Sequence, residues 1–360
     1  MVSLIKKIVL VVLVFFCCIE GISQKCTEVL SSFCNSKTAV DSIFFTKDLK
    51  LVLLGVTLDE NYNEVFDIFN EKKSFSEYNS IALSMPVGVN LIINDWIKHS
   101  NKNIDDLTKD LGNYRLRDDE KRILKTLKHI HQRKSFKIYT IDMEYSLIRS
   151  KTCLIEILSK RKNNLSTTYS LLYTQLTNHK QSKSEFEHVG LFKEVLNGYL
   201  NGIYSDDGSL QEYYNVFKFL MESVKYNSLV TNIKFSNQFR EDIMSLYILD
   251  LLNSESCKLI GLLGVYQIDS SLEGIKYTSK ETVVSIQLNA SKYRNKIKYM
   301  YLLKRSNKSR VNLIHNSLFS ECKSEVGKLL EQIDSSTIFF LDRAATFLKT
   351  SLVYDYILYY

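Results

Sequence analysis

Two closely spaced histidines are the first residues to consider as a metal site. His129 and His131 are two positions apart. On a helix, side chains at this spacing point about 200° from one another and cannot share one metal ion. They lie at the end of a basic helix, where the helix dipole favours positive charge. This structural role accounts for both residues, so we predict no metal site here.

Two pairs of carboxylates lie beside apolar stretches, Asp105 with Asp106 and Asp142 with Glu144. General acid–base catalysis uses paired carboxylates whose environments separate their pKa values. Neither pair has a neighbouring nucleophile or a position that would shift a pKa. We interpret both pairs as solvated helix faces. A hydrolase whose site is assembled from residues distant in the sequence remains open.

Two loop-like segments resemble ligand sites only superficially. Residues 261–264 read Gly-Leu-Leu-Gly, but the preceding strand and the lysine of a phosphate-binding loop are missing. This spacing indicates a close helix–helix approach or a loop. Residues 204–209 resemble an acidic calcium loop without its alternating oxygen ligands and terminal glutamate, which indicates a turn.

Short catalytic motifs are absent from the sequence. It contains no nucleotide-binding glycine motif, no HExxH zinc motif and no GxSxG nucleophile motif. No CxxC occurs either, which excludes zinc ribbons and thioredoxin-type sites. We therefore predict no catalytic residue, no cofactor and no metal, and a protein that is not an enzyme.

The composition is that of a globular protein. Hydrophobic residues make up 45% and charged residues 24% of 360, with 47 Lys and Arg against 40 Asp and Glu. The formal net charge of +7 is small for this length, so we expect no nucleic-acid partner. Residues 121–134 carry a basic face opposite an apolar stripe. We interpret this face as solvated, and binding to an anionic membrane surface is the alternative.

Helical periodicity extends over most of the chain. The clearest helix is 117–133, whose Ile123, Leu124, Leu127 and Ile130 share one side. Its acidic first turn and basic last turn both suit the helix dipole. Further helices are expected over 89–97, 145–160, 185–203, 210–226, 238–252, 313–333 and 335–360. The last of these is so apolar that it must pack into the core or against a partner.

Residues 283–304 do not follow the helical periodicity. Apolar and polar residues alternate over 284–288, and again over 297–303 after a polar turn. A period of two on both sides of a turn indicates a β-hairpin, although 292–305 also fits a helix. The predicted fold is mainly α, an irregular multi-helix domain with one small β-hairpin near residues 283–304. The breaks between 161 and 184 are the best candidate for a subdivision.

The first 23 residues read as a signal peptide. Lys6 and Lys7 precede an apolar run over 8–19, and small residues then mark a cleavage site. The run is too short for a spanning helix, which needs about 20 residues. We expect the mature chain to start at Gln24 as a predominantly helical secreted region over 24–360. No transmembrane helix is expected in it.

Five cysteines follow the leader: Cys26, Cys34, Cys153, Cys257 and Cys322. An oxidising compartment favours pairing, and an odd number leaves at least one thiol over. Cys26 and Cys34 would be about 12 Å apart on a straight helix, so their pairing needs a turn. We predict a local disulfide between Cys26 and Cys34 on such a turn. The pairing of the other three stays open.

The sequons at Asn164, Asn289 and Asn307 are frequent by chance in a chain rich in Asn and Ser. They leave glycosylation undecided. The 22 tyrosines and 19 phenylalanines are explained mostly by core packing. Tyrosines that stay exposed make good anchors at protein interfaces.

These features together resemble the small rhoptry-associated proteins of malaria parasites, the low-molecular-weight rhoptry complex. The resemblance lies in the leader ending at Ser23, in Cys26 and Cys34 behind it, in the basic, proline-poor body and in the tyrosine-rich residues 354–360. It implies a non-enzymatic subunit that binds a larger rhoptry-associated protein. It also implies storage in the rhoptry, an apical secretory organelle, and release around host-cell invasion.

Overall fold

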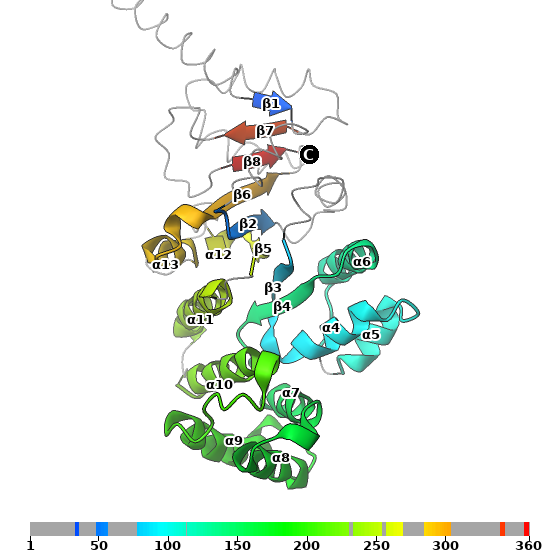
Figure 1. Ribbon diagram of the computed structural model, residues 1–360, viewed down its shortest axis with the longest axis vertical. Helices are drawn as coiled ribbons and strands as arrows, with labels where there is room; N and C mark the ends of the chain where they lie inside the picture. Colours follow the sequence, from blue (N-terminus) through cyan, green and yellow to red (C-terminus); the bar gives the residue numbers. More distant parts are fainter. Residues whose placement is uncertain are drawn as a thin grey trace, which may run out of the picture.

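The computed structural model describes residues 33–35, 48–56, 78–112, 114–229, 233–253, 257–268, 284–303, 339–342 and 356–359. The strands of this part of the chain form a single sheet that extends along the molecule, with helices on both faces (Figure 1). The strands are β1 (Phe33–Asn35), β2 (Leu51–Val56), β3 (Ser80–Pro86), β4 (Lys137–Asp142), β5 (Leu259–Gly264), β6 (Ile297–Leu303), β7 (Phe339–Asp342) and β8 (Tyr356–Tyr359).

The sheet is mostly parallel. Its strand order is β1-β7-β8-β6-β2-β5-β3-β4, and all neighbours from β8 to β4 run parallel. Among the described strands, β7 alone is antiparallel to its two neighbours. Parallel strands need crossover connections, and described helices lie in those from β3 to β4, from β4 to β5 and from β5 to β6.

The central strands are apolar on both faces. In β2, Leu51 and Leu53 belong to one buried cluster, while Val52 and Leu54 belong to another on the opposite face. Strand β5 divides its side chains between the two clusters in the same way. A continuous apolar run is what a strand covered by helices on both sides requires.

Helices cover each face. On one face lie α4 (Asn90–Lys98), α5 (Ile104–Asp110) and α6 (Asp118–Arg133). On the other lie α7 (Leu147–Ser159), α10 (Tyr214–Leu229), α11 (Ile233–Asn253) and α13 (Val284–Ala290), and α8 (Thr167–Asn178) and α9 (Glu185–Leu200) pack outside α7 and α10 (Figure 1). The short helices are η2 (Val87–Val89), η3 (Lys162–Asn164), η4 (Gln211–Tyr213), α12 (Val265–Ile268) and η6 (Arg294–Lys296).

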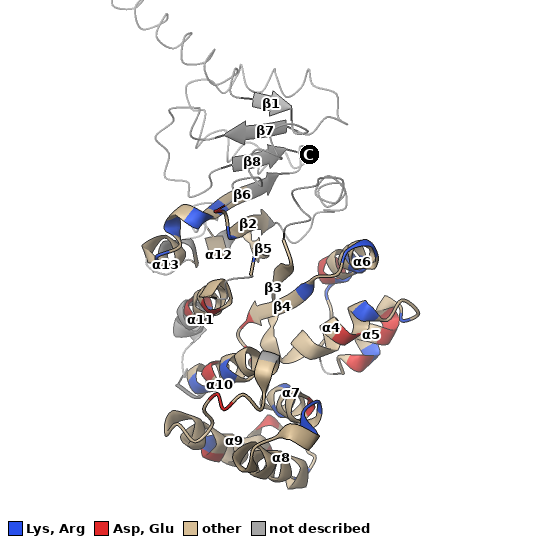
Figure 2. Cartoon of the chain, in the orientation of Figure 1, with Lys and Arg blue, Asp and Glu red and all other residues tan. Residues whose placement is uncertain are grey.

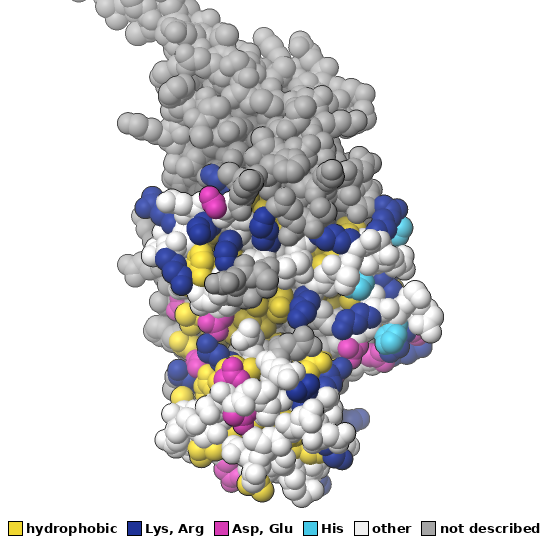
Figure 3. Space-filling model, in the orientation of Figure 1, with side chains coloured by type: hydrophobic (Ala, Val, Ile, Leu, Met, Phe, Trp, Pro, Cys, Tyr) yellow, Lys and Arg dark blue, Asp and Glu magenta, His cyan; other side chains and the backbone are white. Residues whose placement is uncertain are grey.

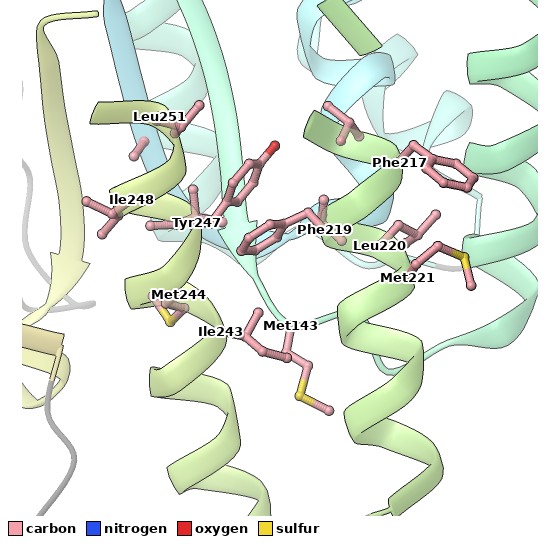
Figure 4. Packing of buried hydrophobic residues seen from close by; sticks show 14 of the residues in the cluster. Met143, Phe217, Phe219, Leu220, Met221, Ile243, Met244, Tyr247, Ile248 and Leu251 are labelled. Atoms are coloured by element: carbon pink, nitrogen blue, oxygen red, sulfur yellow. The ribbon is translucent and has the colours of Figure 1, made fainter. Parts of the chain in front are cut away.

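Aromatic and branched side chains fill the space between α10 and α11. Figure 4 shows Phe219 of α10 facing Tyr247 of α11, with Ile243 and Met143 below them. The Phe219 and Tyr247 rings are stacked, with 22° between their planes. Tyr169 of α8 belongs to the same buried cluster as Leu51 of β2. One core therefore continues across residues 161–184.

The structure corrects the predicted fold class. The fold is α/β, neither mainly α nor all-α, because a largely parallel sheet forms its centre. The hairpin near 283–304 is also wrong: residues 284–290 form α13, and β6 pairs in parallel with β2 and β8. The continuous helix over 335–360 is wrong too, since β7 and β8 lie within it.

The helix over 117–133 is confirmed as α6. The backbone N–H of Arg117 donates to Oε2 of Glu120 at 2.8 Å, which satisfies a donor at the helix N-terminus. Leu124, Leu127 and Ile130 are at most 2% exposed. Because this apolar stripe faces the sheet, it is not available for insertion into a membrane.

One cation of the basic 121–134 segment is buried. Lys128 donates from Nζ to the carbonyl oxygens of Trp96, His99 and Lys102, at the end of α4 and in the loop after it. Its ammonium also lies 4.3 Å from the centre of the Trp96 ring. Burial lowers the pKa of Lys128. This lysine therefore ties α6 to the end of α4.

Replacing Lys128 by Met is expected to lower the free energy of unfolding by about 1–3 kcal/mol, because the carbonyl oxygens of Trp96, His99 and Lys102 lose a charged donor. Chemical denaturation of the two proteins measures the change. Lys125→Met is the matched control, since Lys125 is exposed one turn earlier on α6. An equal loss in the control would show that the carbonyl contacts contribute nothing.

Several predicted features lie outside the described residues: the signal peptide, Cys26, Cys322, Asn307 and the helix over 313–333. The Cys26–Cys34 disulfide therefore stays a prediction. Cys153 and Cys257 are buried free thiols, and burial raises the pKa of each. Within the described ranges, none of the helices has the length and apolar character to cross a membrane.

Candidate functional site

The carboxyl ends of parallel strands form the edge at which α/β sheets usually bind ligands. Here η2 follows β3, the turn before α7 follows β4, and α12 follows β5. Polar side chains gather at this edge around the end of β4. They are Asp142, Glu144, Tyr145, Arg149 and Arg240. This group is the candidate site.

Asp142 is the last residue of β4 and forms a two-pronged ion pair with Arg240 of α11. Nε of Arg240 donates to Oδ1 at 2.6 Å, and the second guanidinium nitrogen contacts Oδ2. The Asp142 side chain is only 7% exposed. Burial alone would lower the pKa of Arg240, but the charge and hydrogen bonds of Asp142 outweigh burial and raise it. The pair joins β4 to α11.

Glu144 lies two residues further on and is held by Arg149 of α7. Nε and the second nitrogen of Arg149 donate to Oε1 at 3.1 and 2.8 Å, and the backbone N–H of Ser146 donates to the same oxygen at 2.8 Å. The Glu144 side chain is fully buried and that of Arg149 is 20% exposed. Burial raises the pKa of Glu144, and Arg149 opposes this shift.

The N-terminus of α7, at the same edge, is occupied by a third carboxylate. Glu185 of α9 accepts from the Ser146 hydroxyl at 2.6 Å and from the backbone N–H of Leu147 at 2.6 Å. Helix N-termini bind anions because of their unpaired N–H groups and the helix dipole. Here the protein supplies that anion from its own chain.

Glu144 packs against Gly88 of η2 and leaves no room for a side chain at that position. A Cβ added at position 88 would overlap Oε2 of Glu144. We expect Gly88→Ala to lower the free energy of unfolding by about 1–3 kcal/mol through this clash. Gly190→Ala is the control: nothing lies within 4 Å of its Cβ in α9, and alanine there should stabilise by about 0.5–1 kcal/mol. Thermal unfolding of both variants measures whether Gly88→Ala lowers stability and Gly190→Ala raises it. The same change in stability in both variants would contradict the close contact between Gly88 and Glu144.

Tyr145 and Tyr114 flank the two ion pairs. Tyr145 is 43% exposed, and burial together with the Asp142 charge raises its pKa to about 12. It stays protonated at neutral pH and can donate a hydrogen bond. Tyr114 donates to Glu120 at 2.8 Å, and its ring lies 5.5 Å from the Arg149 guanidinium. Chemically, the site offers paired charges and a phenol donor.

A second polar group follows β5. Oε1 of Gln267 accepts from the backbone N–H of Gly264 at 2.8 Å, and the side-chain amide of Gln287 donates to Asp242. Burial raises the pKa of Asp242, and the Gln287 bond opposes the shift. These contacts connect α12 and α13 to α11 and the sheet.

Asp142 and Glu144 are the sequence candidates that the structure places at this edge. The interpretation as solvated helix faces is wrong for them. Asp142 ends β4 and Glu144 lies just after it, and both are buried and paired with arginines. Arg149 and Arg240 were not predicted. Arg240 lies 98 residues from Asp142, and only the parallel arrangement of β4 and its neighbours would have pointed to this edge.

The other sequence candidates lie elsewhere. His129 contacts Arg133 at 2.9 Å, and the His131 ring packs against Phe136. Asp105 and Asp106 lie in the first turn of α5. Gly261–Gly264 belongs to β5, so its interpretation as a loop or helix contact is wrong. Among the described residues, no group of three or more His, Cys, Asp or Glu is placed to hold a metal ion.

The turn over 204–209 is confirmed. Asp206 and Asp207 accept from the backbone N–H groups of Gly208 and Ser209 at 3.1 and 2.9 Å. Hydrogen bonds from Ser166, at the start of α8, and from Ser209 lower the pKa of Asp207 against the effect of burial. A shallow hollow of about 540 Å³ lies beside this turn, away from the sheet edge.

Three solved structures share this fold. An erythromycin esterase mutant, EreC H289N, has 9% identity and a TM-score of 0.53, covering 89% of this chain and 92% of its own. A succinoglycan biosynthesis protein has 12% identity and a TM-score of 0.59, covering 94% and 96%. A Bacillus cereus protein has 10% identity and a TM-score of 0.56, covering 94% and 97%.

These likenesses define the class of fold: an α/β fold with a mostly parallel sheet, also used by an esterase. At identities near 10% they establish the fold alone. No family model and no curated protein matches the sequence.

Proposed function

We propose that this protein is a non-enzymatic interaction subunit of a secreted parasite complex. In this proposal it binds a larger rhoptry-associated protein, is stored in the rhoptry and acts around host-cell invasion. The parasite complex, the larger partner and the rhoptry in this proposal come from the sequence resemblance. The arrangement of charges at the carboxyl edge of the sheet supports the absence of catalysis.

The observation that carries the proposal is the pairing of the carboxylates around the end of β4. Asp142 and Glu144 each bind an arginine through two nitrogens. Glu185 fills the N-terminus of α7. A general base must reach a substrate proton, and a buried carboxylate that already accepts several hydrogen bonds is poorly placed to do so. These groups instead connect β4, α7, α9 and α11.

A hydrolase is the second candidate. It is favoured by the fold shared with an erythromycin esterase and by the position of two carboxylates where such sheets bind ligands. In that case Asp142 or Glu144 would take part in proton transfer. The two candidates differ in what the purified protein does to an ester and in what it binds.

The alternative, binding to a membrane surface through residues 121–134, has less support. The apolar side of α6 is buried and Lys128 is bonded to carbonyl oxygens inside the fold. An amphipathic helix that lies in a membrane surface needs its apolar face available. Contact with lipid would have to depend on surface charge alone.

Isolation of the native protein from parasites tests the proposal. The protein should elute in size exclusion well above 41.8 kDa and bring a larger rhoptry-associated protein with it, identified by mass spectrometry. Elution as a monomer would contradict the proposal. Ester hydrolysis by the purified chain that is lost in Asp142→Asn and in Glu144→Gln would support the hydrolase instead.

A further inference from the structure

The amino edge of the sheet, opposite the candidate site, carries a row of lysines. Lys296, Lys50, Lys258 and Lys137 precede or begin β6, β2, β5 and β4. Backbone hydrogen bonds hold the row together. The N–H of Lys50 donates to Lys296 O at 2.9 Å, and Leu259 N–H donates to Lys50 O at 2.8 Å.

Asn79 continues the row toward β4. Its N–H donates to Lys258 O at 3.2 Å, and Lys137 N–H donates to Asn79 O at 3.0 Å. Neighbouring strands lie about 4.8 Å apart, so these cations follow one another closely across the sheet. We call this surface the amino-edge row. It consists of the described segments 48–50, 78–79, 134–137, 257–258 and 291–298.

The amino-edge row concentrates positive charge. Its described residues include eight Lys and Arg against one acid, Asp48. That excess equals the formal net charge of the whole chain, +7. Lys137, Lys292 and Arg294 are exposed. Figure 2 marks the connection from α13 to β6 in blue, and Figure 3 shows Lys and Arg side chains spread over the surface around α13, β6 and β2.

Two contacts keep parts of the row in place. Nζ of Lys50 donates to Leu252 O at 3.2 Å and Nζ of Lys134 donates to Tyr78 O at 2.6 Å. The aromatic rings of the row are inside: Tyr78 is 3% and Tyr293 8% exposed. Lys50 and Lys134 are thus held against the fold, and the exposed cations of the row are Lys137, Lys292 and Arg294, with buried aromatic rings behind them.

We propose that the amino-edge row is the docking surface for an acidic surface of the protein partner. The proposal rests on the proposed function, an interaction subunit, and names the part of it that binds. Complementary charge speeds association and selects partners. The large exposed apolar side chains of the described residues lie on other segments, such as Leu171 and Phe186. Since the apolar side chains among the described residues of the row are buried, the row fits carboxylates of a protein better than a membrane.

The test uses the full chain with three exposed cations reversed together: Lys137→Glu, Lys292→Glu and Arg294→Glu. The matched control reverses three exposed lysines around α9: Lys180→Glu, Lys183→Glu and Lys193→Glu. Both variants change the net charge equally. Poly-L-glutamate is the acidic probe, and vesicles of phosphatidylcholine with phosphatidylserine are the membrane probe.

We expect the wild type and the control to bind poly-L-glutamate and the amino-edge variant to bind it at least about tenfold more weakly, with salt weakening all three. An equal loss in both variants would show general charge attraction and overturn the proposal. So would binding of the wild type to the anionic vesicles but not to poly-L-glutamate.

The partner itself separates this proposal from the proposed function. If the wild type and the control assemble with the larger rhoptry-associated protein and the amino-edge variant does not, both proposals are supported. Assembly of all three proteins would overturn the docking surface and leave the function standing. If the wild type itself does not assemble, the function fails, and the poly-L-glutamate result still reports on the surface.

Discussion

Replacing Arg149 by Met is expected to lower the free energy of unfolding by about 3–5 kcal/mol, because it leaves the buried carboxylate of Glu144 without its cation. The Glu144 side chain is fully buried and Arg149 supplies two of its hydrogen-bond donors. Urea denaturation measures the loss. The double variant with Glu144→Gln removes the buried charge as well and should recover part of it.

Lys121→Met is the matched control for this prediction. Lys121 pairs with Asp118 at 3.6 Å, and the two side chains are 35% and 88% exposed. An exposed pair of this kind contributes about 0–1 kcal/mol. If Arg149→Met were no more harmful than Lys121→Met, the buried pair would not stabilise the edge of the sheet.

The effect of pH on the stability of Arg149→Met follows from the direction in which the pKa of Glu144 is shifted. Burial raises the pKa of Glu144 in the folded protein, and Arg149 opposes the increase. Without Arg149 the pKa rises further, so the folded variant binds a proton more readily than the unfolded chain. Stability is then lost as pH rises through the folded pKa. The deficit relative to the wild type should shrink as pH falls from about 7 toward 5.

Replacing Phe217 by Ala is expected to cost about 3–5 kcal/mol, as large-to-small changes of buried aromatic residues do. Phe217 is fully buried in α10. Its ring contacts those of Tyr169, Tyr199, Tyr204 and Tyr214, with centres 5.5 to 6.3 Å away. The cavity would open where α8 and α9 pack on α10.

Phe186→Ala makes the same chemical change on the surface. Phe186 is 84% exposed at the start of α9, so its loss should change the free energy of unfolding by less than about 0.5 kcal/mol. Thermal and urea unfolding of both variants give the comparison. A small effect at Phe217 would mean that the outer helices do not pack as the structure shows.

The parallel strands were missed because they lack the period of two. Strands β2 and β5 read LVLLGV and LIGLLG, with apolar residues facing both helical layers. Such a run cannot be distinguished from a buried helix by periodicity. Residues 297–303 do alternate and do form β6, but their partners are distant strands. Local sequence gives no information on that pairing.

The helices were predicted well where one face is polar. In α6 the apolar stripe, the Glu120 cap and the charged ends all favour a helix over the same residues. The observed bounds differ from the expected ones by one residue. Of the two ion pairs in the candidate site, the sequence pointed to the carboxylates but not to the arginines. Asp142 and Glu144 are recognisable as close carboxylates, whereas Arg149 and Arg240 gain their role from folding. Spacing along the chain does not show which cation will reach a carboxylate.

The direct measurement of the central claim uses two purified proteins, this chain and a larger rhoptry-associated protein, mixed and separated by size exclusion with light scattering. An interaction subunit predicts one peak whose mass accounts for both proteins. Two peaks at the masses of the separate proteins would contradict the account.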